Sequence, residues 1–388
     1  MREITNNTTK RIDWIDGIKG ISCLFIFFHH FCIQYFPSTY FGNEKPSMFN
    51  GIDTFLSTSP LGFFINGNFF VHLFIFISGY VITYQIISMK HDEKIGLFML
   101  KRYLKLLFPI AVFGLIMLFS RSFHILKQDP SIKLILKEIY KIVYSVFIGI
   151  LFKGDNYLGG HFWMMNCIFL GGLLVGLITT LLWYYDDKRI ILIPVLLGCL
   201  LLVFPLKETS HFPPVFFGCA LCMINKYYSI TIKRQYTIIL LIISIILGAF
   251  PSSIVATNFY KYLLLPLDKA NSFSKLYWHN LATILFIIAI ANNDLLKSVF
   301  STKICLLFSK ISFWVYLIHV EIIYFADRFL KPLQDGFSSY LLAVLVIFLI
   351  DLIIILLSST LLYKFVSPIG TKGINLLFAK LQPKTEDN

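Results

Sequence analysis

Charged side chains are scarce in this sequence. Asp, Glu, Lys and Arg make up 14% of the 388 residues, whereas hydrophobic residues make up 57% and the mean hydropathy is +0.75. A soluble core of this length would need many more charged residues on its surface, so the composition argues against a pair of soluble domains. It is typical of integral membrane proteins.

A basic face and a cleavage site are also missing. Basic residues outnumber acidic ones by 34 to 21, and the net charge is +13. Because Lys and Arg are scattered between apolar runs, we attribute them to membrane topology and expect no nucleic-acid partner. No small-residue cleavage pattern follows the first apolar run, so we expect the first helix to be retained rather than removed as a signal peptide.

The seven cysteines are an odd number and lie mostly inside apolar stretches. Cys219 and Cys222 have CxxC spacing, but inside a predicted span we interpret them as two small packing residues rather than a redox or metal pair. We expect no metal site and no permanently bound cofactor.

The apolar runs predict an all-α, polytopic bundle of transmembrane helices. A span needs about 20 mostly apolar residues, and about ten runs qualify. They form a single membrane domain over 1–388, with a short polar lead (1–13), a tail (365–388) that is too short to fold alone, and no appended soluble esterase domain. The predicted spans are 15–36, 69–88, 103–120, 162–184, 190–205, 212–225, 237–250, 279–292, 304–325 and 339–362.

The positive-inside rule decides the topology. With ten spans and both termini cytoplasmic, the basic segments 90–105, 186–189, 225–236 and 292–303 all lie inside. If the short apolar run 142–152 also crossed, the last three of these would move outside, so we predict that it does not cross. The Lys-rich segment before it then forms an interfacial or re-entrant element, with Lys133, Lys137 and Lys141 on one polar face.

The first predicted span, "WIDGIKGISCLFIFFHHF" (14–31), contains four ionisable residues. Lys19 and His30 lie almost three whole helical turns apart, so they share one stripe. Asp16 is close enough on the helix to pair with Lys19, whereas His29 points away from His30 by about 100°. An intramembrane ionisable group is a functional candidate by default. Alternatively, Lys19 snorkels to the inner interface and His29 is an interfacial histidine.

The segment "RIDWIDGIKGISCLFIFFHHF" (11–31) resembles the opening of the integral membrane acyltransferase-3 family of bacterial surface-glycan O-acyltransferases. Its members carry Leu-Asp-Gly-Leu-Arg-Gly, an apolar run and a histidine, with ten residues between Arg and His. Lys19 and His30 have that spacing here. Lys in place of Arg keeps the charge but loses the bidentate guanidinium fork.

Four further segments are similar to family motifs in the same order, so the resemblance extends over about 11–320. They are 67–83, 99–109, 161–175 and 310–320. Their matching residues include Val71, Leu73, Phe74, Ser78, Gly79, Lys101, Arg102, Lys105, Trp163, Met165, Gly171, Ser312, Tyr316, Leu317 and His319. One departure is Ile168, which replaces a Glu of one family branch and predicts different substrate contacts.

The resemblance implies a multi-pass enzyme of the cytoplasmic membrane that moves an acyl group, commonly acetyl from acetyl-CoA, to a hydroxyl of a surface or exported glycan. The expected partners are membrane lipid, acyl-CoA and a polysaccharide or lipid-linked glycan acceptor. A sugar hydroxyl is a poor nucleophile, so His30 is the predicted general base, or else a covalent carrier of the acyl group. We predict that Lys19, steadied by Asp16, helps to position the acyl donor.

Further residues are assigned to the predicted site. Lys101, Arg102 and Lys105 either bind CoA phosphates or serve only as a positive-inside cluster. Ser78 either donates to an oxyanion or, as we favour, packs as a small residue. Trp163 either stacks on a sugar or adenine or is an interfacial aromatic. Tyr316 and His319 lie one helical turn apart and form either a shared polar site or a structural pair.

Two acidic residues in predicted spans favour a different class of protein. Glu321 and Asp351 would suit a proton- or ion-coupled transporter. The sequence shows no internal repeat and no paired Gly/Pro breaks, which such a transporter would favour. A nonenzymatic glycan-export protein is the third alternative.

Overall fold

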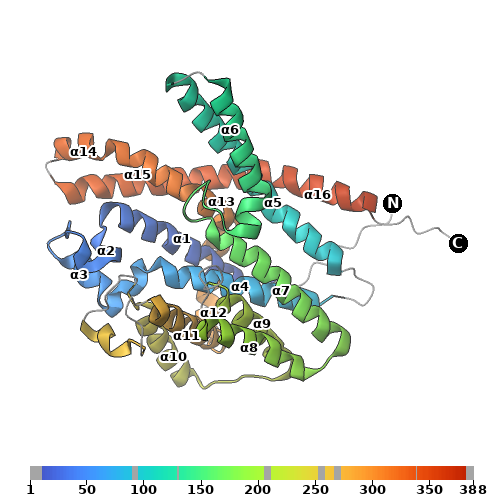
Figure 1. The fold of residues 1–388 in the computed structure, drawn as a ribbon. Coiled ribbons are helices and arrows are strands. Elements are labelled where there is room, and N and C mark those ends of the chain that lie inside the picture. The colour runs from blue at the N-terminus through green and yellow to red at the C-terminus, as the bar shows by residue number, and fades with distance from the viewer. Residues whose placement is uncertain are drawn as a thin grey trace. The chain divides into compact units, whose positions relative to one another are not determined.

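The computed structural model describes residues 11–89, 95–128, 131–204, 211–251, 258–265, 272–337 and 339–381. Every regular element assigned in these ranges is a helix (Figure 1), which confirms the all-α class. The chain divides into two compact units, the first formed by Met1–Glu93 with Leu174–Ser312 and the second by Lys94–Leu173 with Phe313–Asn388. We describe each unit by itself.

The helices of the first unit are α1 (Asp13–Tyr35), α2 (Ser38–Phe41), η1 (Gly42–Glu44), α3 (Ile52–Ser57), η2 (Pro60–Ile65), α4 (Gly67–Ile87), η4 (Lys188–Ile191), α8 (Leu192–Val203), α9 (Pro213–Tyr227), α10 (Arg234–Gly248), η5 (Asn258–Leu263), α11 (Ser272–Ala291) and α12 (Asp294–Phe300). Those of the second are α5 (Ile95–Gln128), α6 (Ile132–Tyr144), η3 (Ser145–Lys153), η6 (Asp327–Phe329), α14 (Leu330–Phe337), α15 (Tyr340–Leu361), η7 (Leu362–Val366) and α16 (Ser367–Leu381). Helices α7 (Trp163–Tyr185) and α13 (Lys303–Ala326) contribute residues to both units.

Each of the ten predicted spans coincides with a helix. Seven of the described helices are long and apolar enough to cross a membrane, so the chain is a multi-pass membrane protein. Helices α8, α9 and α10 have 12, 15 and 15 residues, fewer than the roughly 20 that a straight crossing needs. The count of ten spans and the cytoplasmic termini therefore stay predictions. The seven candidates are Asp13–Tyr35, Gly67–Ile87, Ile95–Lys127, Trp163–Tyr185, Ser274–Ala291, Lys303–Phe329 and Tyr340–Ala379.

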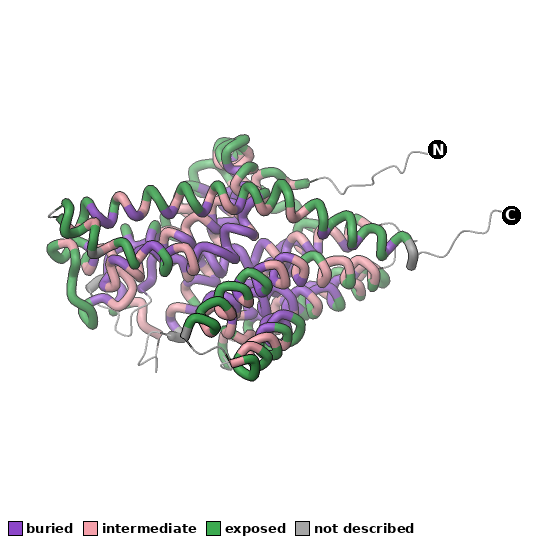
Figure 2. The backbone as a smooth tube through the Cα atoms, turned by 90° about the horizontal axis from the view of Figure 1, so that it is seen from above, coloured by how far each residue is buried: buried purple, intermediate pink, exposed green. Residues whose placement is uncertain are grey.

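Helix α15 shows how lipid shapes these surfaces. Its exposed stripe is apolar and repeats every four residues through Leu345, Leu349, Ile353 and Leu357. Such a stripe would be unfavourable in water, but it matches the hydrocarbon of a bilayer. Buried and exposed positions alternate in the same way along most of the long helices (Figure 2).

Helix α4 packs against both α1 and α9. Its contact with α9 depends on glycine, because a Cβ added at Gly79 would lie 2.0 Å from the carbonyl oxygen of Val215. A Cβ at Gly218 of α9 would lie 2.0 Å from the carbonyl oxygen of Phe76. Small residues allow membrane helices to approach this closely, and the close packing holds α4 at the centre of the first unit (Figure 1).

The basic segment between residues 121 and 153 belongs to the second unit. Arg121 of α5 pairs with Glu138 of α6 at 3.1 Å and donates to the carbonyl oxygen of Tyr157 at 3.0 Å. Lys133, Lys137 and Lys141 are exposed on α6, as the predicted polar face requires. Helix α6 continues directly into η3, and whether 142–152 crosses the membrane stays a prediction.

Candidate functional site

Two adjacent histidines near the end of α1 form the core of the candidate site. Their ring centroids are 5.5 Å apart at an angle of 65°. His29 is buried and His30 is half-buried. The Nδ1 atom of His29 lies 2.7 Å from the carbonyl oxygen of Ile65. Because a carbonyl oxygen only accepts, Nδ1 carries the hydrogen and Nε2 is the basic nitrogen of the neutral ring.

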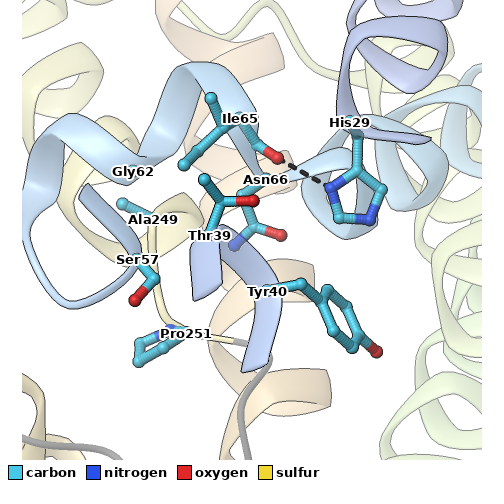
Figure 3. Close-up of a pocket in the computed structure, with 9 residues that line it drawn as sticks. All are labelled: His29, Thr39, Tyr40, Ser57, Gly62, Ile65, Asn66, Ala249 and Pro251. Carbon is cyan, nitrogen blue, oxygen red and sulfur yellow. Dashed lines mark hydrogen bonds between the residues drawn. The ribbon is translucent and has the colours of Figure 1, made fainter. Parts of the chain in front are cut away.

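His29 lines a small pocket whose walls come from α1, α2, α3, η2 and the segment after α10 (Figure 3). Its volume is about 10 Å³, enough for about one water molecule. A single hydroxyl group therefore fits between these side chains, whereas a whole sugar ring does not. The pocket is lined by His29, Thr39, Tyr40, Ser57, Gly62, Ile65, Asn66, Ala249 and Pro251.

The position of the His29 ring depends on the absence of a side chain at Gly67. A Cβ added there would lie 2.5 Å from the Cγ and Cδ2 atoms of the ring. On the other side, the Tyr40 ring lies 5.6 Å from that of His29, centroid to centroid. Burial raises the pKa of Tyr40, so its phenol remains a neutral hydrogen-bond donor at physiological pH.

Asn66 connects the pocket to α10 and α11. Its Nδ2 atom donates to the carbonyl oxygens of Gly248 at 3.1 Å and Phe250 at 2.8 Å. It also lies 3.2 Å from Nε2 of His279. Since Asn66 directly follows Ile65, these contacts hold the backbone whose carbonyl orients His29.

Three further histidines gather behind the pocket. The ring of His72 lies 5.5 Å from that of His279 and 5.9 Å from that of His211. Nδ1 of His72 donates to the carbonyl oxygen of Asn68 at 2.7 Å, and its Nε2 is buried without a hydrogen bond among the described residues. No group of three or more His, Cys, Asp or Glu side chains in the described part of the chain is arranged to hold a metal ion.

Lys19 and Asp16 lie toward the other end of α1. The Lys19 ammonium is 4.0 Å from the Asp16 carboxylate, which also lies 3.9 Å from the Arg11 guanidinium. The pairing that the sequence predicts between Lys19 and Asp16 is therefore present. The donor-positioning role stays a prediction.

Tyr316 and His319 lie in the second unit, where the structure adds His161. The Tyr316 hydroxyl donates to the backbone oxygen of His161, and the rings of His161 and His319 are 5.1 Å apart. Nδ1 of His319 bonds carbonyl oxygens of its own helix, the nearer at 2.8 Å. These are bonds that a structural pair makes. A shared polar site at this pair stays a prediction.

The remaining predicted site residues lie on α4, α5 and α7, and their roles stay predictions. Lys101, Arg102 and Lys105 lie in the early turns of α5, and the Lys101 ammonium sits 5.9 Å from the Phe378 ring of α16. Trp163 begins α7. Ser78 is a half-buried residue of α4, directly before the tightly packed Gly79.

Sequence reasoning left an interfacial role open for His29 and did not assign Tyr40, Asn66, His72, His211, His279 or His161. One signal was available: five of the nine histidines lie in or next to predicted spans of the first unit, near the ends that the topology places outside. His161 also opens a segment that the resemblance already singled out. Composition alone could not show that these side chains meet.

The model of the acyltransferase-3 family, described as an acyltransferase domain, matches residues 12–363. The chain belongs to this family. No curated protein and no solved structure matches it. Acyltransferase-3 membership makes the chain a membrane acyltransferase, and the match covers helices of both units.

Proposed function

We propose that this acyltransferase-3 protein is a membrane-bound O-acyltransferase that moves acetyl from acetyl-CoA to a hydroxyl of a cell-surface or exported polysaccharide, at the cytoplasmic membrane of a bacterium. The observation that carries the proposal is the oriented imidazole of His29 beside His30, in a pocket that admits a single hydroxyl group. A neutral imidazole with one nitrogen anchored is suited to general-base catalysis.

An imidazole of the His29–His30 pair can carry the proton through the whole reaction. The imidazole accepts the hydroxyl proton while the acceptor oxygen bonds to the thioester carbonyl carbon, and the carbonyl electron pair moves onto its oxygen. When the carbonyl re-forms, the carbon–sulfur bond breaks, and the CoA thiolate takes the proton from the imidazolium. The products are the ester and CoA. The spacing from Lys19 favours His30 as the base, and the bond to Ile65 favours His29.

The predicted topology supports an acceptor on the outer side. The connections 37–68, 206–211 and 251–278 all lie outside if there are ten spans with cytoplasmic termini. Tyr40, His211 and Pro251 come from these three connections, and each lines the pocket or contacts the histidines behind it. Lys19, Lys101, Arg102 and Lys105 lie near the opposite ends of their predicted spans. We propose that they bind the acyl donor from the cytoplasmic side.

The direct test is the acetyl content of purified surface polysaccharide, measured by NMR. Cells would carry the wild-type protein, His29→Ala, His30→Ala or a deletion, with membrane levels of each variant verified. Loss of ester signals in the deletion and in at least one histidine variant, with glycan yield intact, would support the proposal. Unchanged esters in the deletion would contradict it.

One observation favours a second candidate, a proton- or ion-coupled transporter or glycan-export protein. Asp351 is 0% exposed in α15, and among the described residues neither of its carboxylate oxygens has a hydrogen-bond partner. A buried acid in a span commonly marks an ion or proton pathway. If Asp351→Asn reduced solute uptake or glycan export while acetyl content stayed normal, transport would become the better description.

A further inference from the structure

Lys275 lies near the beginning of α11, close to the histidine pocket of the first unit. Two hydrogen bonds hold this end of α11 in place. The Trp278 indole donates to the carbonyl oxygen of Leu263 at 2.7 Å, and the backbone N–H of Leu265 donates to the Ser274 hydroxyl at 2.9 Å. Lys275 is therefore a half-buried side chain on a fixed helix end rather than on a loose connection.

The helical register directs Lys275 toward the pocket. It precedes His279 by one turn on the same face of α11. His279 lies 3.2 Å from the amide of Asn66, which lines the pocket beside His29. Lys275 thus lies one turn from a histidine that contacts the pocket wall, although about 250 residues separate it from His29 along the chain.

The electrostatic environment of the pocket agrees with this placement. Among the described residues, the ammonium of Lys275 lies close enough to interact electrostatically with the rings of His29, His72, His211 and His279, and neighbouring histidines also act on three of these rings. The described part of the pocket thus places the Lys275 ammonium close to several imidazoles. Such a site is complementary to a group that becomes negative during the reaction.

We propose that Lys275 supplies the positive charge that stabilises the oxyanion formed when the acceptor hydroxyl attacks the thioester at the His29–His30 pocket. This inference rests on the proposed function, because only acyl transfer creates that oxyanion. The charge exists in the tetrahedral intermediate and not in the bound thioester, so Lys275 favours the transition state over the ground state. A preorganised ammonium in a site with little water is worth more than the same charge in bulk solvent.

The test compares Lys275→Met with Lys275→Arg. Detergent-solubilised protein would transfer label from [14C]acetyl-CoA to polysaccharide extracted from cells lacking the protein. Both kcat and KM would be measured, and thermal unfolding would be followed for each variant. Lys297→Met is the matched control, because Lys297 is also half-buried but lies on α12, whose last residue, Phe300, packs against Gly17 near the beginning of α1.

We expect Lys275→Met to lower kcat by about 10²- to 10³-fold, the usual cost of losing one oxyanion-stabilising group. KM values should change less than about threefold, Lys275→Arg should recover most of the loss, and Lys297→Met should behave as wild type.

Three results would overturn the assignment while leaving the proposed function intact. An unchanged kcat in Lys275→Met would show that Lys275 does not stabilise the oxyanion. A rise in acceptor KM alone would make Lys275 a ground-state binding residue. Equal loss in the Arg and Met variants, with lower thermal stability in both, would make the role structural. A wild-type protein that transfers no acetyl would instead overturn the proposed function, and this inference with it.

Discussion

His29 donates its Nδ1 hydrogen to the carbonyl oxygen of Ile65 at 2.7 Å, and this bond leaves Nε2 as the basic nitrogen. Ile65 ends η2, and the next residue, Asn66, donates to the carbonyl oxygens of Gly248, the last residue of α10, and of Phe250, two residues later. The orientation of a side chain on the first helix is therefore set by a connection more than thirty residues later and by a helix near residue 248.

Replacing His29 separates its hydrogen bond from its basicity. His29→Asn retains a donor near the position of Nδ1 but removes the base, so we expect thermal stability near that of wild type and a loss of about 10²- to 10⁴-fold in kcat. His29→Ala should lose stability as well as activity. The measurement is acetyl transfer from labelled acetyl-CoA, together with thermal unfolding in detergent. If the His29→Asn protein were active, His29 would not be the general base, and His30 would be assigned that role.

Gly67→Ala tests whether the place of the His29 ring matters. The new methyl group would lie 2.5 Å from the ring, so the ring or α4 has to shift. A displacement of about 1 Å can cost up to 10²-fold in rate, and we expect a loss of 10- to 100-fold in kcat. Gly96→Ala is the control, because a Cβ there meets nothing within 4 Å. Equal activity of the two variants would show that the ring position is not critical.

Gly79→Ala should destabilise the first unit. Its Cβ would lie 2.0 Å from the backbone oxygen of Val215, and a backbone atom cannot move aside alone. We expect a loss of about 1–3 kcal/mol or more in the free energy of unfolding, from overpacking. Gly373→Ala of α16 is the control, since nothing lies within 4 Å of the added Cβ. Thermal unfolding in detergent is the measurement, and identical melting of both variants would contradict close α4–α9 packing.

Protonation of the Asp53 carboxylate should lower the stability of the connection before α4 at acidic pH. Burial alone would raise the pKa of Asp53, but hydrogen bonds from Ser47, Met48 and Thr54 outweigh burial and lower it. The folded pKa therefore lies below the unfolded value of about 3.9. The stabilisation is complete above about pH 4 and is lost as the pH falls through the folded pKa.

The comparison of wild type with Asp53→Asn checks this. The difference in unfolding free energy should be about 1–3 kcal/mol at pH 7 and should shrink below about pH 4. Thermal unfolding between pH 3 and pH 7 measures it. A difference that stays constant over this range would show that the carboxylate charge contributes nothing.

Local sequence patterns by themselves determine the helices, one ion pair and the family of this protein. The long apolar runs predict the helices because hydrophobicity and helical period are properties of neighbouring residues. The pair between Asp16 and Lys19 follows from their spacing on one helix. The family resemblance, which sequence motifs carried, is confirmed by a match over 12–363.

The tertiary structure alone decided how the candidate site is assembled. His29, Asn66, His72, His211, Lys275 and His279 come from four distant segments, and no periodicity in the sequence relates one segment to another. Helical register shows which residues share a face of one helix, but the packing of α1, α4, α9 and α11 decides which faces meet. For that reason the sequence identified the first helix as functional, and only the fold showed that the Ile65 carbonyl oxygen orients His29.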